Sequence, residues 1–241
     1  IASCLVGSEM CKETGYKPFY GRNFFSRSAA LIPRAETEHL IDWVLEKNVA
    51  DKSLQLWDIG TGSGIIAITL KLERPRWEII ASDVSKQALC LAQQNCDHLG
   101  AQLTLIQGNW FDTTAAVTKN HFDVIISNPP YIDKESPYLE QGDLRFEPKI
   151  ALTDEKDGLA AYRVLSKEAL YYLKPQGWLC VEHGYTQQAA IQQMFYKAGW
   201  TNIECRKDYA GLDRLIAAKN PRNLNSLNRV ISVSYTHLTL P

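Results

Sequence analysis

Apolar residues at the start of the chain follow no clear period. Aromatic and small residues mix in residues 1–32, which we interpret as short strands and the remnant of a preceding domain. From Glu36 onward, by contrast, Leu40, Ile41, Val44 and Leu45 share one helical face and charged residues fill the other positions. This spacing predicts a helix that begins shortly after Pro33.

Short apolar runs then alternate with helical patterns. We predict strands at residues 54–57, 77–81, 103–106, 122–126, 178–181, 203–205 and 215–217. Predicted helices separate them at residues 65–72, from a cap at Ser85 to Gly100, at 159–173 and at 187–198. Alternating strands and helices favour a mostly parallel sheet with helices on both faces. The pattern therefore predicts an α/β protein with a doubly wound sheet of seven strands.

The residues after 218 depart from this pattern. They are rich in Asn and Ser and show no apolar period that could dock onto the sheet. We expect residues 219–241 to form a disordered or non-native tail. A length of 241 residues allows one full α/β domain, which we place at residues 33–218, plus a short extra segment.

Charge and cysteine content narrow the range of partners. The formal net charge is −1, whereas a protein that binds nucleic acid through phosphates usually has a large basic excess. The six cysteines are scattered without zinc spacing, and no apolar stretch reaches the ~20 residues that span a bilayer. We therefore expect a protein of a reducing compartment, the cytoplasm, that does not enter membranes and does not use a metal. We also expect a monomer, and we do not expect nucleic acid as a partner.

A glycine-rich turn follows the first predicted strand of the domain. Open parallel sheets bind ligands beyond the carboxyl ends of their strands, and here that end reads Asp58-Ile59-Gly60-Thr61-Gly62-Ser63-Gly64. A dinucleotide fingerprint would require its third glycine at position 65, which is Ile65. A phosphate-binding P-loop would require Gly-Lys-Ser/Thr, which does not follow. The turn therefore binds a different ligand or is only a tight turn.

Two further strand ends favour an adenosine ligand. Asp83 ends the second strand, where a carboxylate can accept hydrogen bonds from both ribose hydroxyls. Trp110 follows the third strand, where an indole can lie against an adenine ring. Taken singly, Asp83 can belong to a helix cap and Trp110 to the core. Together with the glycine turn they predict an adenosine site.

The fourth strand ends in Asn128-Pro129-Pro130-Tyr131, which suits chemistry at an amide nitrogen. An amide nitrogen is a poor nucleophile because its lone pair is delocalised into the carbonyl group. The Asn128 side-chain oxygen and the Pro129 carbonyl can accept its two N–H groups, and the Tyr131 ring can cover its flat face. Proline makes the turn stiff, so the acceptors are held in position. The alternative is an ordinary Pro-Pro turn.

These motifs resemble a known family. Asn128–Tyr131 is similar to the Asn-Pro-Pro-Tyr motif of class I methyltransferases that modify amino groups. Together with four further segments it resembles the HemK/PrmC release-factor glutamine methyltransferases, over about residues 15–218. The segments are Ile32–Thr37, Asp58–Gly64, Asn109–Phe111 and Gly142–Pro148.

The resemblance implies a class I, Rossmann-like fold and S-adenosylmethionine as the methyl donor. It places the cofactor on Asp58, Gly60, Thr61, Gly62, Ser63, Gly64, Asp83, Trp110 and Asn128. It places the acceptor glutamine on Asn128, Pro129, Pro130 and Tyr131, with Asn128, Pro129 and Tyr131 as the catalytic set. The implied reaction is methylation of a glutamine N5 in the Gly-Gly-Gln loop of a peptide chain release factor. Residues 1–32 would be what remains of the family's N-terminal helical domain, and Ala35 replaces a usual proline.

Three alternatives stay open at this point. A ribosomal-protein glutamine is a close variant of the substrate. An adenine-N6 methyltransferase shares the Asn-Pro-Pro-Tyr chemistry but needs a flipped base and a basic recognition segment, which the sequence does not show. A non-catalytic adenosine-binding module conflicts with the intact motif. Arg145 and Glu147 can be contacts of a substrate loop or a surface ion pair, and we expect the ion pair. We expect His183 to have a structural role rather than to act as a general base.

Overall fold

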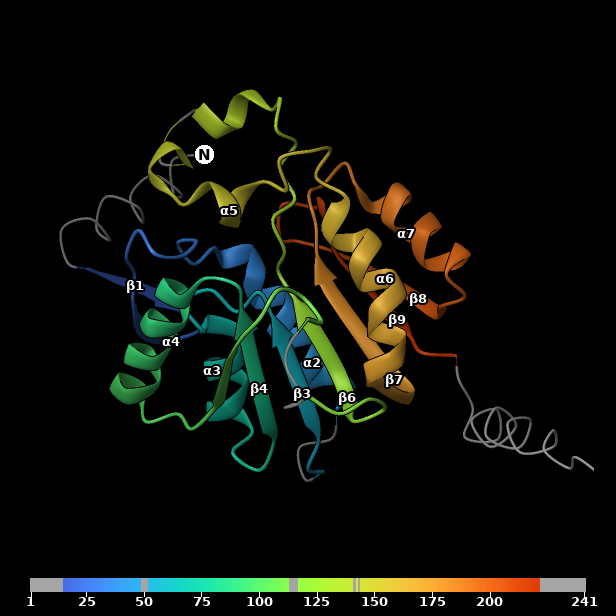
Figure 1. Cartoon of the computed structure of the whole chain (residues 1–241), viewed down its shortest axis with the longest axis horizontal. Helices are drawn as coiled ribbons and strands as arrows, with labels where there is room; N and C mark the ends of the chain where they lie inside the picture. The colour runs from blue at the N-terminus through green and yellow to red at the C-terminus, as the bar shows by residue number, and fades with distance from the viewer. Residues whose placement is uncertain (1–14, 49–51, 113–116, 141, 143, 222–241) are drawn as a thin grey trace, which may run out of the picture.

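Seven strands form the central sheet of the computed structural model, which describes residues 15–48, 52–112, 117–140, 142 and 144–221 (Figure 1). Their order is β5 (Thr104–Gln107), β4 (Glu78–Asp83), β3 (Gln55–Ile59), β6 (Phe122–Ser127), β7 (Leu173–Glu182), β9 (Asp213–Lys219) and β8 (Thr201–Lys207). Neighbours from β5 to β7 run parallel, whereas β9 is antiparallel to both β7 and β8. The predicted mostly parallel sheet of seven strands is confirmed.

Successive residues of the inner strands enter two separate cores. Leu56 and Val124 pack with α2 (Glu38–Lys47), α3 (Ile65–Glu73) and α4 (Lys86–Leu99) on one face. Trp57 and Ile125 pack with α6 (Ala160–Tyr172) and α7 (Gln188–Lys197) on the other. Strands that are buried on both faces read as continuous apolar runs, which is the pattern seen in the sequence. The sheet is therefore doubly wound, as predicted.

The ends of α4 follow from its flanking residues. The Ser85 hydroxyl accepts a hydrogen bond from the Ala88 N–H at 3.2 Å and caps the first turn. Gly100 ends the helix in the left-handed conformation at φ 71°, and its N–H donates to the Cys96 carbonyl. Both predicted helix ends are confirmed. They matter for function because this helix follows Asp83 directly.

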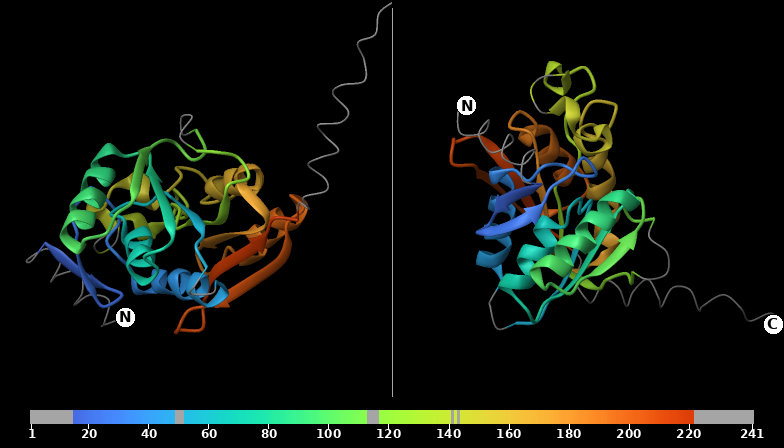
Figure 2. Two further views of the ribbon diagram at one scale, coloured as in Figure 1. Left: turned by 90° about the horizontal axis from the view of Figure 1, so that it is seen from below. Right: turned by 90° about the vertical axis from the view of Figure 1, so that its left-hand side faces the viewer.

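The N-terminal strands form a hairpin of β1 (Tyr16–Phe19) and β2 (Arg22–Phe25) that lies beside α4 (Figure 2). Phe19 and Phe24 are buried in the same core as α2, and the Phe25 N–H donates to Asn95 Oδ1 at 2.7 Å. The domain boundary at residue 32 stays a prediction, but the hairpin is packed onto the sheet domain. Within the described ranges, no helix has the length and apolar character required to cross a membrane.

At the other end, β9 continues to Lys219 and Asn220 is fully buried. Both residues therefore belong to the sheet domain, next to β7, although we had assigned them to the tail. Residues 222–241, the remainder of the predicted tail, lie outside the described residues.

A segment without strands rises above the carboxyl ends of the sheet (Figure 1). We call residues 132–158 the cap. It contains two 3₁₀ turns, η2 (Pro137–Glu140) and η3 (Leu144–Phe146), and the short helix α5 (Lys149–Leu152). The start of the cap meets the end of α5, where the Ile132 N–H donates to the Leu152 carbonyl at 2.9 Å. Because it joins β6 to α6, the cap lies directly over the predicted site.

Candidate active site

A cavity of about 540 Å³ opens at the carboxyl ends of the parallel strands. Its wall includes residues that end or follow four of them: Gly60–Ser63 after β3, Asp83 of β4, Gly108–Trp110 after β5, and Asn128 after β6. Its other side is formed by Ile32–Arg34 and by Ile150 and Ala151 of the cap. The volume is that of a site for a nucleoside-sized ligand. The strand ends singled out in the sequence are therefore brought together around one cavity.

The glycine turn is shaped by residues on both of its sides. Gly60, Thr61, Gly62 and Ser63 line the cavity, and Gly60 and Gly62 have φ values of 74° and 58° that favour glycine. Asp58 lies behind the turn, fully buried, and accepts a hydrogen bond from the Thr61 hydroxyl at 2.6 Å. Burial raises the pKa of the Asp58 carboxyl to about 7.

Gly64 begins α3 in the left-handed conformation. A Cβ there would lie 2.8 Å from Ile68 Cδ1 and 3.2 Å from Ala92 Cβ, so a larger residue would require these side chains to shift. Asp58 and Gly64 thus hold the turn, while the residues between them face the cavity.

Asp83, at the end of the neighbouring strand β4, is hydrogen-bonded to the glycine turn. Its Oδ2 accepts from the Gly62 N–H at 2.9 Å and its Oδ1 accepts from the Ser85 N–H at 2.8 Å. Burial raises the pKa of this carboxyl. A carboxylate has about four acceptor positions, so these two bonds leave capacity for hydroxyl donors in the cavity. In this geometry Asp83 can belong to the helix-cap region and also bind a ligand, so the two alternatives from the sequence are compatible.

Trp110 lines the cavity on the side of β5. Its backbone adopts φ 52°, which is unusual for a bulky residue, and its indole packs against the core on the α6 side of the sheet. Phe111 behind it is buried and meets Trp57 edge-on at 5.3 Å between ring centroids. The neighbouring aromatic core therefore supports an indole at the edge of the cavity.

Asn128 presents an acceptor that the protein itself does not use. Its Nδ2 donates to Thr37 Oγ1 at 3.1 Å, whereas its Oδ1 is buried and has no hydrogen-bond partner among the described residues. A buried oxygen without a partner costs about 1–3 kcal/mol, so such an atom calls for an explanation. Asn128 lines the cavity, so the N–H group of a ligand there would be a partner for this oxygen.

The other residues of this turn occupy different positions. Pro130 lines the cavity with Asn128, and Pro129 is buried. Tyr131 packs with the core on the α6 side, and its hydroxyl donates to Glu182 Oε1 at 3.3 Å. Burial raises the pKa of the Tyr131 hydroxyl, so it stays protonated and remains a donor.

Glu182 ends β7 and is a functional candidate that the sequence analysis did not identify. It is 2% exposed, and its Oε2 accepts from the Thr37 hydroxyl at 2.8 Å. Burial raises the pKa of its carboxyl to about 7, against the opposing effects of Thr37 and Arg214. The signal was present in the sequence, since Glu182 directly follows the apolar run 178–181, just as Asp58 follows the run 54–57. Thr37 belongs to the motif Ile32–Thr37, but the sequence analysis assigned it no role.

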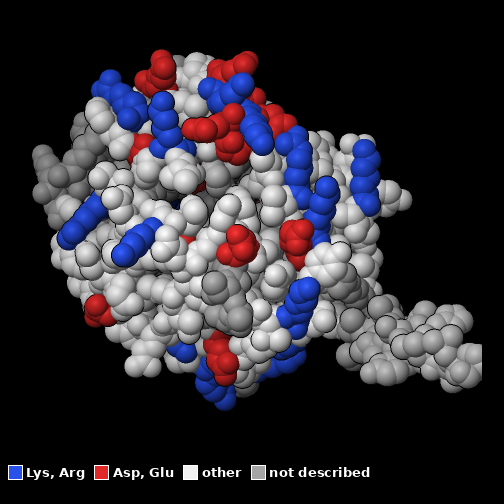
Figure 3. All heavy atoms as spheres, in the orientation of Figure 1, with Lys and Arg blue, Asp and Glu red and all other residues white. Residues whose placement is uncertain are grey.

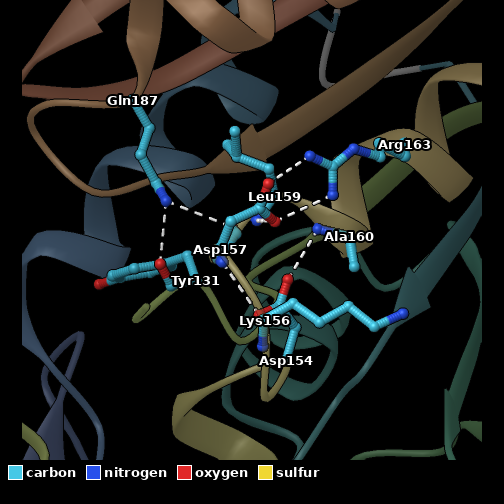
Figure 4. A network of polar contacts seen from close by, with 9 residues as sticks. Tyr131, Asp154, Lys156, Asp157, Leu159, Ala160, Arg163 and Gln187 are labelled. Carbon is cyan, nitrogen blue, oxygen red and sulfur yellow. Dashed lines mark hydrogen bonds and ion pairs between the residues drawn. The ribbon is translucent and has the colours of Figure 1, made fainter. Parts of the chain in front are cut away.

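Gln187 joins three loops behind the Asn-Pro-Pro-Tyr turn (Figure 4). Its Nε2 donates to the Tyr131 carbonyl at 2.9 Å and to the Gly158 carbonyl at 3.2 Å, and its Oε1 accepts from the Gly184 N–H at 3.0 Å. Asp154 holds the end of the cap by accepting from the Gly158 and Ala160 N–H groups. The turn after Asn128 is therefore braced from both β7 and α6. Sequence reasoning did not find these residues either.

The predicted surface ion pair of Arg145 and Glu147 is wrong. Glu147 is 7% exposed, and its carboxylate accepts from the Ile32 N–H at 2.8 Å and from the Arg34 guanidinium. It thereby ties the cap to the loop before α2, more than a hundred residues away in the chain. Arg145 instead stacks on the Phe146 ring at 4.6 Å from its centroid.

His183 is fully buried next to Glu182. Its Nδ1 lies 2.9 Å from the Gly184 carbonyl, and its backbone N–H donates to the Arg214 carbonyl at 2.9 Å. Burial lowers the pKa of the imidazole. These contacts agree with the structural role expected for this residue.

Relatives of known identity match the chain over most of its length. A release factor glutamine methyltransferase of Neisseria gonorrhoeae is 43% identical over 220 residues, which cover 91% of this chain and 80% of the relative. A protein of the same name from Bordetella pertussis is 39% identical, over 88% of this chain and 77% of its own length. The chain belongs to the release factor glutamine methyltransferase family.

The fold agrees with this membership. The methyltransferase small domain family matches residues 36–140, which contain the glycine turn, Asp83, Trp110 and Asn128. A solved methyltransferase structure from Pyrococcus furiosus is similar with a TM-score of 0.63 at 17% identity, over 92% of this chain and 98% of that one. The chain is therefore an enzyme of the release factor glutamine methyltransferase family, with a class I methyltransferase fold.

Proposed function

We propose that the enzyme transfers a methyl group from S-adenosylmethionine to the side-chain nitrogen N5 of a glutamine, and that this glutamine belongs to the Gly-Gly-Gln loop of a peptide chain release factor. The observation that carries the proposal is Asn128, which lines the cavity and whose buried Oδ1 has no hydrogen-bond partner among the described residues. The names of the relatives support the choice of substrate.

The residues around the cavity fit S-adenosylmethionine. The Asp83 carboxylate has free acceptor positions for ribose hydroxyls, Trp110 offers an aromatic face for the adenine, and the turn from Gly60 to Gly64 lets the ligand approach the backbone. When bound, this cofactor supplies an electrophilic methyl group on a sulfonium. The enzyme's own contribution is to hold the cofactor in a fixed orientation at the strand ends.

The acceptor amide is assigned to the turn after β6. Asn128 Oδ1 and the Pro129 carbonyl accept the two N–H groups of the glutamine side chain, which aligns its nitrogen for transfer. Fixed polar groups of this kind act by positioning and by electrostatic stabilisation in a site that excludes water. The partly buried ring of Tyr131 and the hydrogen bonds of Gln187 keep the turn rigid and take no part in bond changes.

The surface charge suits a protein substrate better than a nucleic acid. Acidic and basic side chains alternate over the cap, and no block of one sign covers the face seen in Figure 3. The formal net charge of the whole chain is −1. Binding to a phosphate backbone normally requires a concentrated basic surface.

Binding calorimetry tests the cofactor assignment. S-Adenosylhomocysteine should bind and NAD should not, and Asp83→Ala should weaken binding of S-adenosylhomocysteine by roughly 1–3 kcal/mol, the usual cost of losing a charged hydrogen-bond partner. Asp97→Asn on the exposed side of α4 is the matched control and should bind like the unchanged protein. Tight NAD binding without a response to S-adenosylhomocysteine would refute the assignment.

The acceptor assignment requires a transfer assay. The protein is incubated with methyl-labelled S-adenosylmethionine and, in parallel, with a release factor, with its Gln→Ala variant in the Gly-Gly-Gln loop, with ribosomes and with DNA. Label should enter the unchanged release factor alone. Label in ribosomal protein or in DNA, with none in the release factor, would replace the proposed substrate by one of the alternatives.

A further inference from the structure

A chain of hydrogen bonds runs from the interior to the acceptor atom of the site. Glu182 accepts from the Thr37 hydroxyl at 2.8 Å, and Thr37 Oγ1 in turn accepts from Asn128 Nδ2 at 3.1 Å. Thr37 and Glu182 are 1% and 2% exposed, so water does not substitute for either partner. The chain therefore couples the end of β7 to the end of β6 through the loop before α2.

The positions of the protons in these hydrogen bonds fix the orientation of the Asn128 amide. An ionised carboxylate only accepts hydrogen bonds, so the one proton of the Thr37 hydroxyl is directed to Glu182. The hydroxyl then faces Asn128 with a lone pair, which only the Nδ2 end of the amide can meet. Oδ1 is consequently turned away from Thr37. This agrees with the finding that Oδ1 is buried and meets no hydrogen-bond donor in the part of the chain that the structure describes.

The opposite orientation would disable the site. With the amide reversed, Asn128 would present two N–H donors to the cavity. A substrate amide nitrogen also carries N–H donors, so the two groups would repel each other instead of pairing. The orientation of one side-chain amide thus decides whether the acceptor glutamine can bind productively.

We propose that Glu182 and Thr37 are positioning residues for methyl transfer, which hold the Asn128 amide with its oxygen toward the cavity. The inference rests on the proposed function, because it assumes a substrate that offers N–H groups. Neither residue touches the substrate. They act through Asn128, and they do so only while Glu182 is ionised.

Protonation of Glu182 would reverse the direction of the hydrogen bonds that run from Glu182 through Thr37 to Asn128. A neutral carboxyl can donate to Thr37 Oγ1, which frees the Thr37 proton to pair with Asn128 Oδ1. Burial places the pKa of Glu182 at about 7, so this change falls near neutral pH. Several charged and titratable groups surround Glu182. They are Glu36 of η1, Tyr131 after β6, Tyr162 of α6, His183 after β7, and Asp208 and Arg214 of the β8–β9 hairpin. Of these, Arg214 favours the ionised form and Glu36 opposes it.

The decisive experiment compares conservative changes at Thr37 with a matched change elsewhere. Thr37→Val keeps the side-chain shape but removes the hydroxyl, and it should lower kcat on a release factor by roughly tenfold to a hundredfold. Thr37→Ser restores the hydroxyl and should recover most of this loss. Thr69→Val in α3 is the control, because Thr69 is also fully buried but its hydroxyl has no partner among the described residues. It should leave kcat unchanged.

Glu182→Gln adds a pH signature that a purely structural role would not give. The unchanged enzyme should lose kcat as the pH falls through about 7, because protonated Glu182 no longer directs the Thr37 proton. Glu182→Gln should have a lower kcat with no such decline, since its amide cannot ionise. Affinity for S-adenosylhomocysteine should stay within about twofold in all these variants, because the hydrogen bonds from Glu182 to Asn128 affect the binding of the acceptor glutamine.

NMR spectroscopy can detect the state of these hydrogen bonds in the absence of a substrate. The side-chain NH₂ signals of Asn128, identified by their loss in Asn128→Ala, should shift with pH near 7 in the unchanged protein and stay constant in Glu182→Gln. The inference is overturned if these signals do not titrate, if Thr37→Val keeps full kcat, or if Thr37→Ser is as impaired as Thr37→Val. An unchanged enzyme that leaves the release factor unmodified while these signals titrate would refute the proposed function and not this inference.

Discussion

Asn128 has one polar atom that the fold satisfies and one that it leaves free. Asn128→Ala should therefore reduce methyl transfer by about 10²–10³ in kcat, the usual effect of removing one fixed polar group at a reacting centre. The fold should be largely retained, because among the described residues the side chain makes one hydrogen bond, from Nδ2 to Thr37 Oγ1, and none through Oδ1. Single-turnover transfer and thermal melting measure the two effects separately. Tyr131→Phe should cost less than about tenfold, because Thr37 still donates to Glu182. The reverse ranking of the two variants would contradict these roles.

The contacts of Asn128 also change what is expected of Asn128→Asp. From the sequence alone this variant keeps an acceptor and should retain partial activity. In the structure, an aspartate oxygen would replace Nδ2 opposite Thr37, whose single proton already goes to Glu182. Two carboxylates would then compete for that proton. The sequence identified the residue and its chemistry, but the partner that restricts it lies ninety-one positions away.

At the scale of elements, the sheet and its helices could be predicted because their apolar pattern is local. The strand ends at Asp58, Asp83 and Asn128 lie where the sequence indicated, since parallel strands bring their carboxyl ends to one edge. The cap could not be predicted. Its attachment depends on Glu147 reaching Ile32 and Arg34, and on Gln187 bridging Tyr131 and Gly158. Such contacts leave no periodic signal in the chain.

Gly158 offers a test of how closely the cap end fits against the active-site turn. Its φ is 71°, and a Cβ there would lie 2.3 Å from the Tyr131 carbonyl oxygen. Gly158→Ala should therefore cost more than the about 1 kcal/mol of positive-φ strain, and it should lower kcat by displacing the turn. Gly211→Ala is the matched control, because its φ is 79° and a Cβ would meet nothing within 4 Å. Equal losses of unfolding free energy in urea would show that the close contact has no effect.

At the scale of the whole molecule, Asn220 defines where the chain can be shortened, because it is anchored close to the end of the described residues. The Asn220 Nδ2 lies within hydrogen-bond distance of the carbonyls of Leu170, Leu173 and Lys174, and its backbone N–H donates to the Gly177 carbonyl. Removal of residues 222–241 should leave the melting temperature unchanged, because the sequence there has no apolar period. Removal from residue 220 onward should lower it by several degrees, since buried carbonyls lose their partner. Equal melting temperatures for the two truncations would contradict this.

Stability of the whole domain should also respond to the buried carboxyl of Asp58. Its pKa is raised from 3.8 to about 7 in the folded chain, so the folded state binds more protons than the unfolded state between these values. The buried charge therefore costs nothing below pH 4, and its cost grows as the pH rises to about 7. Asp58→Asn removes this charge and keeps an acceptor for the Thr61 hydroxyl. Its unfolding free energy relative to the unchanged protein should increase between pH 5 and pH 7, by at most about 1.4 kcal/mol per pH unit.

The comparison requires a carboxylate that stays ionised throughout this range. Asp157 pairs with Arg163 at the surface and has its pKa lowered to about 2, so Asp157→Asn should differ from the unchanged protein by a constant amount between pH 5 and pH 8. Urea denaturation of the three proteins at each pH, in the same salt, gives both differences. A pH-independent difference for Asp58→Asn would mean that Asp58 is fully ionised in the folded enzyme above pH 5. The glycine turn would then be held by a charged carboxylate, and the Thr61 hydroxyl alone would not account for the stability of that charge.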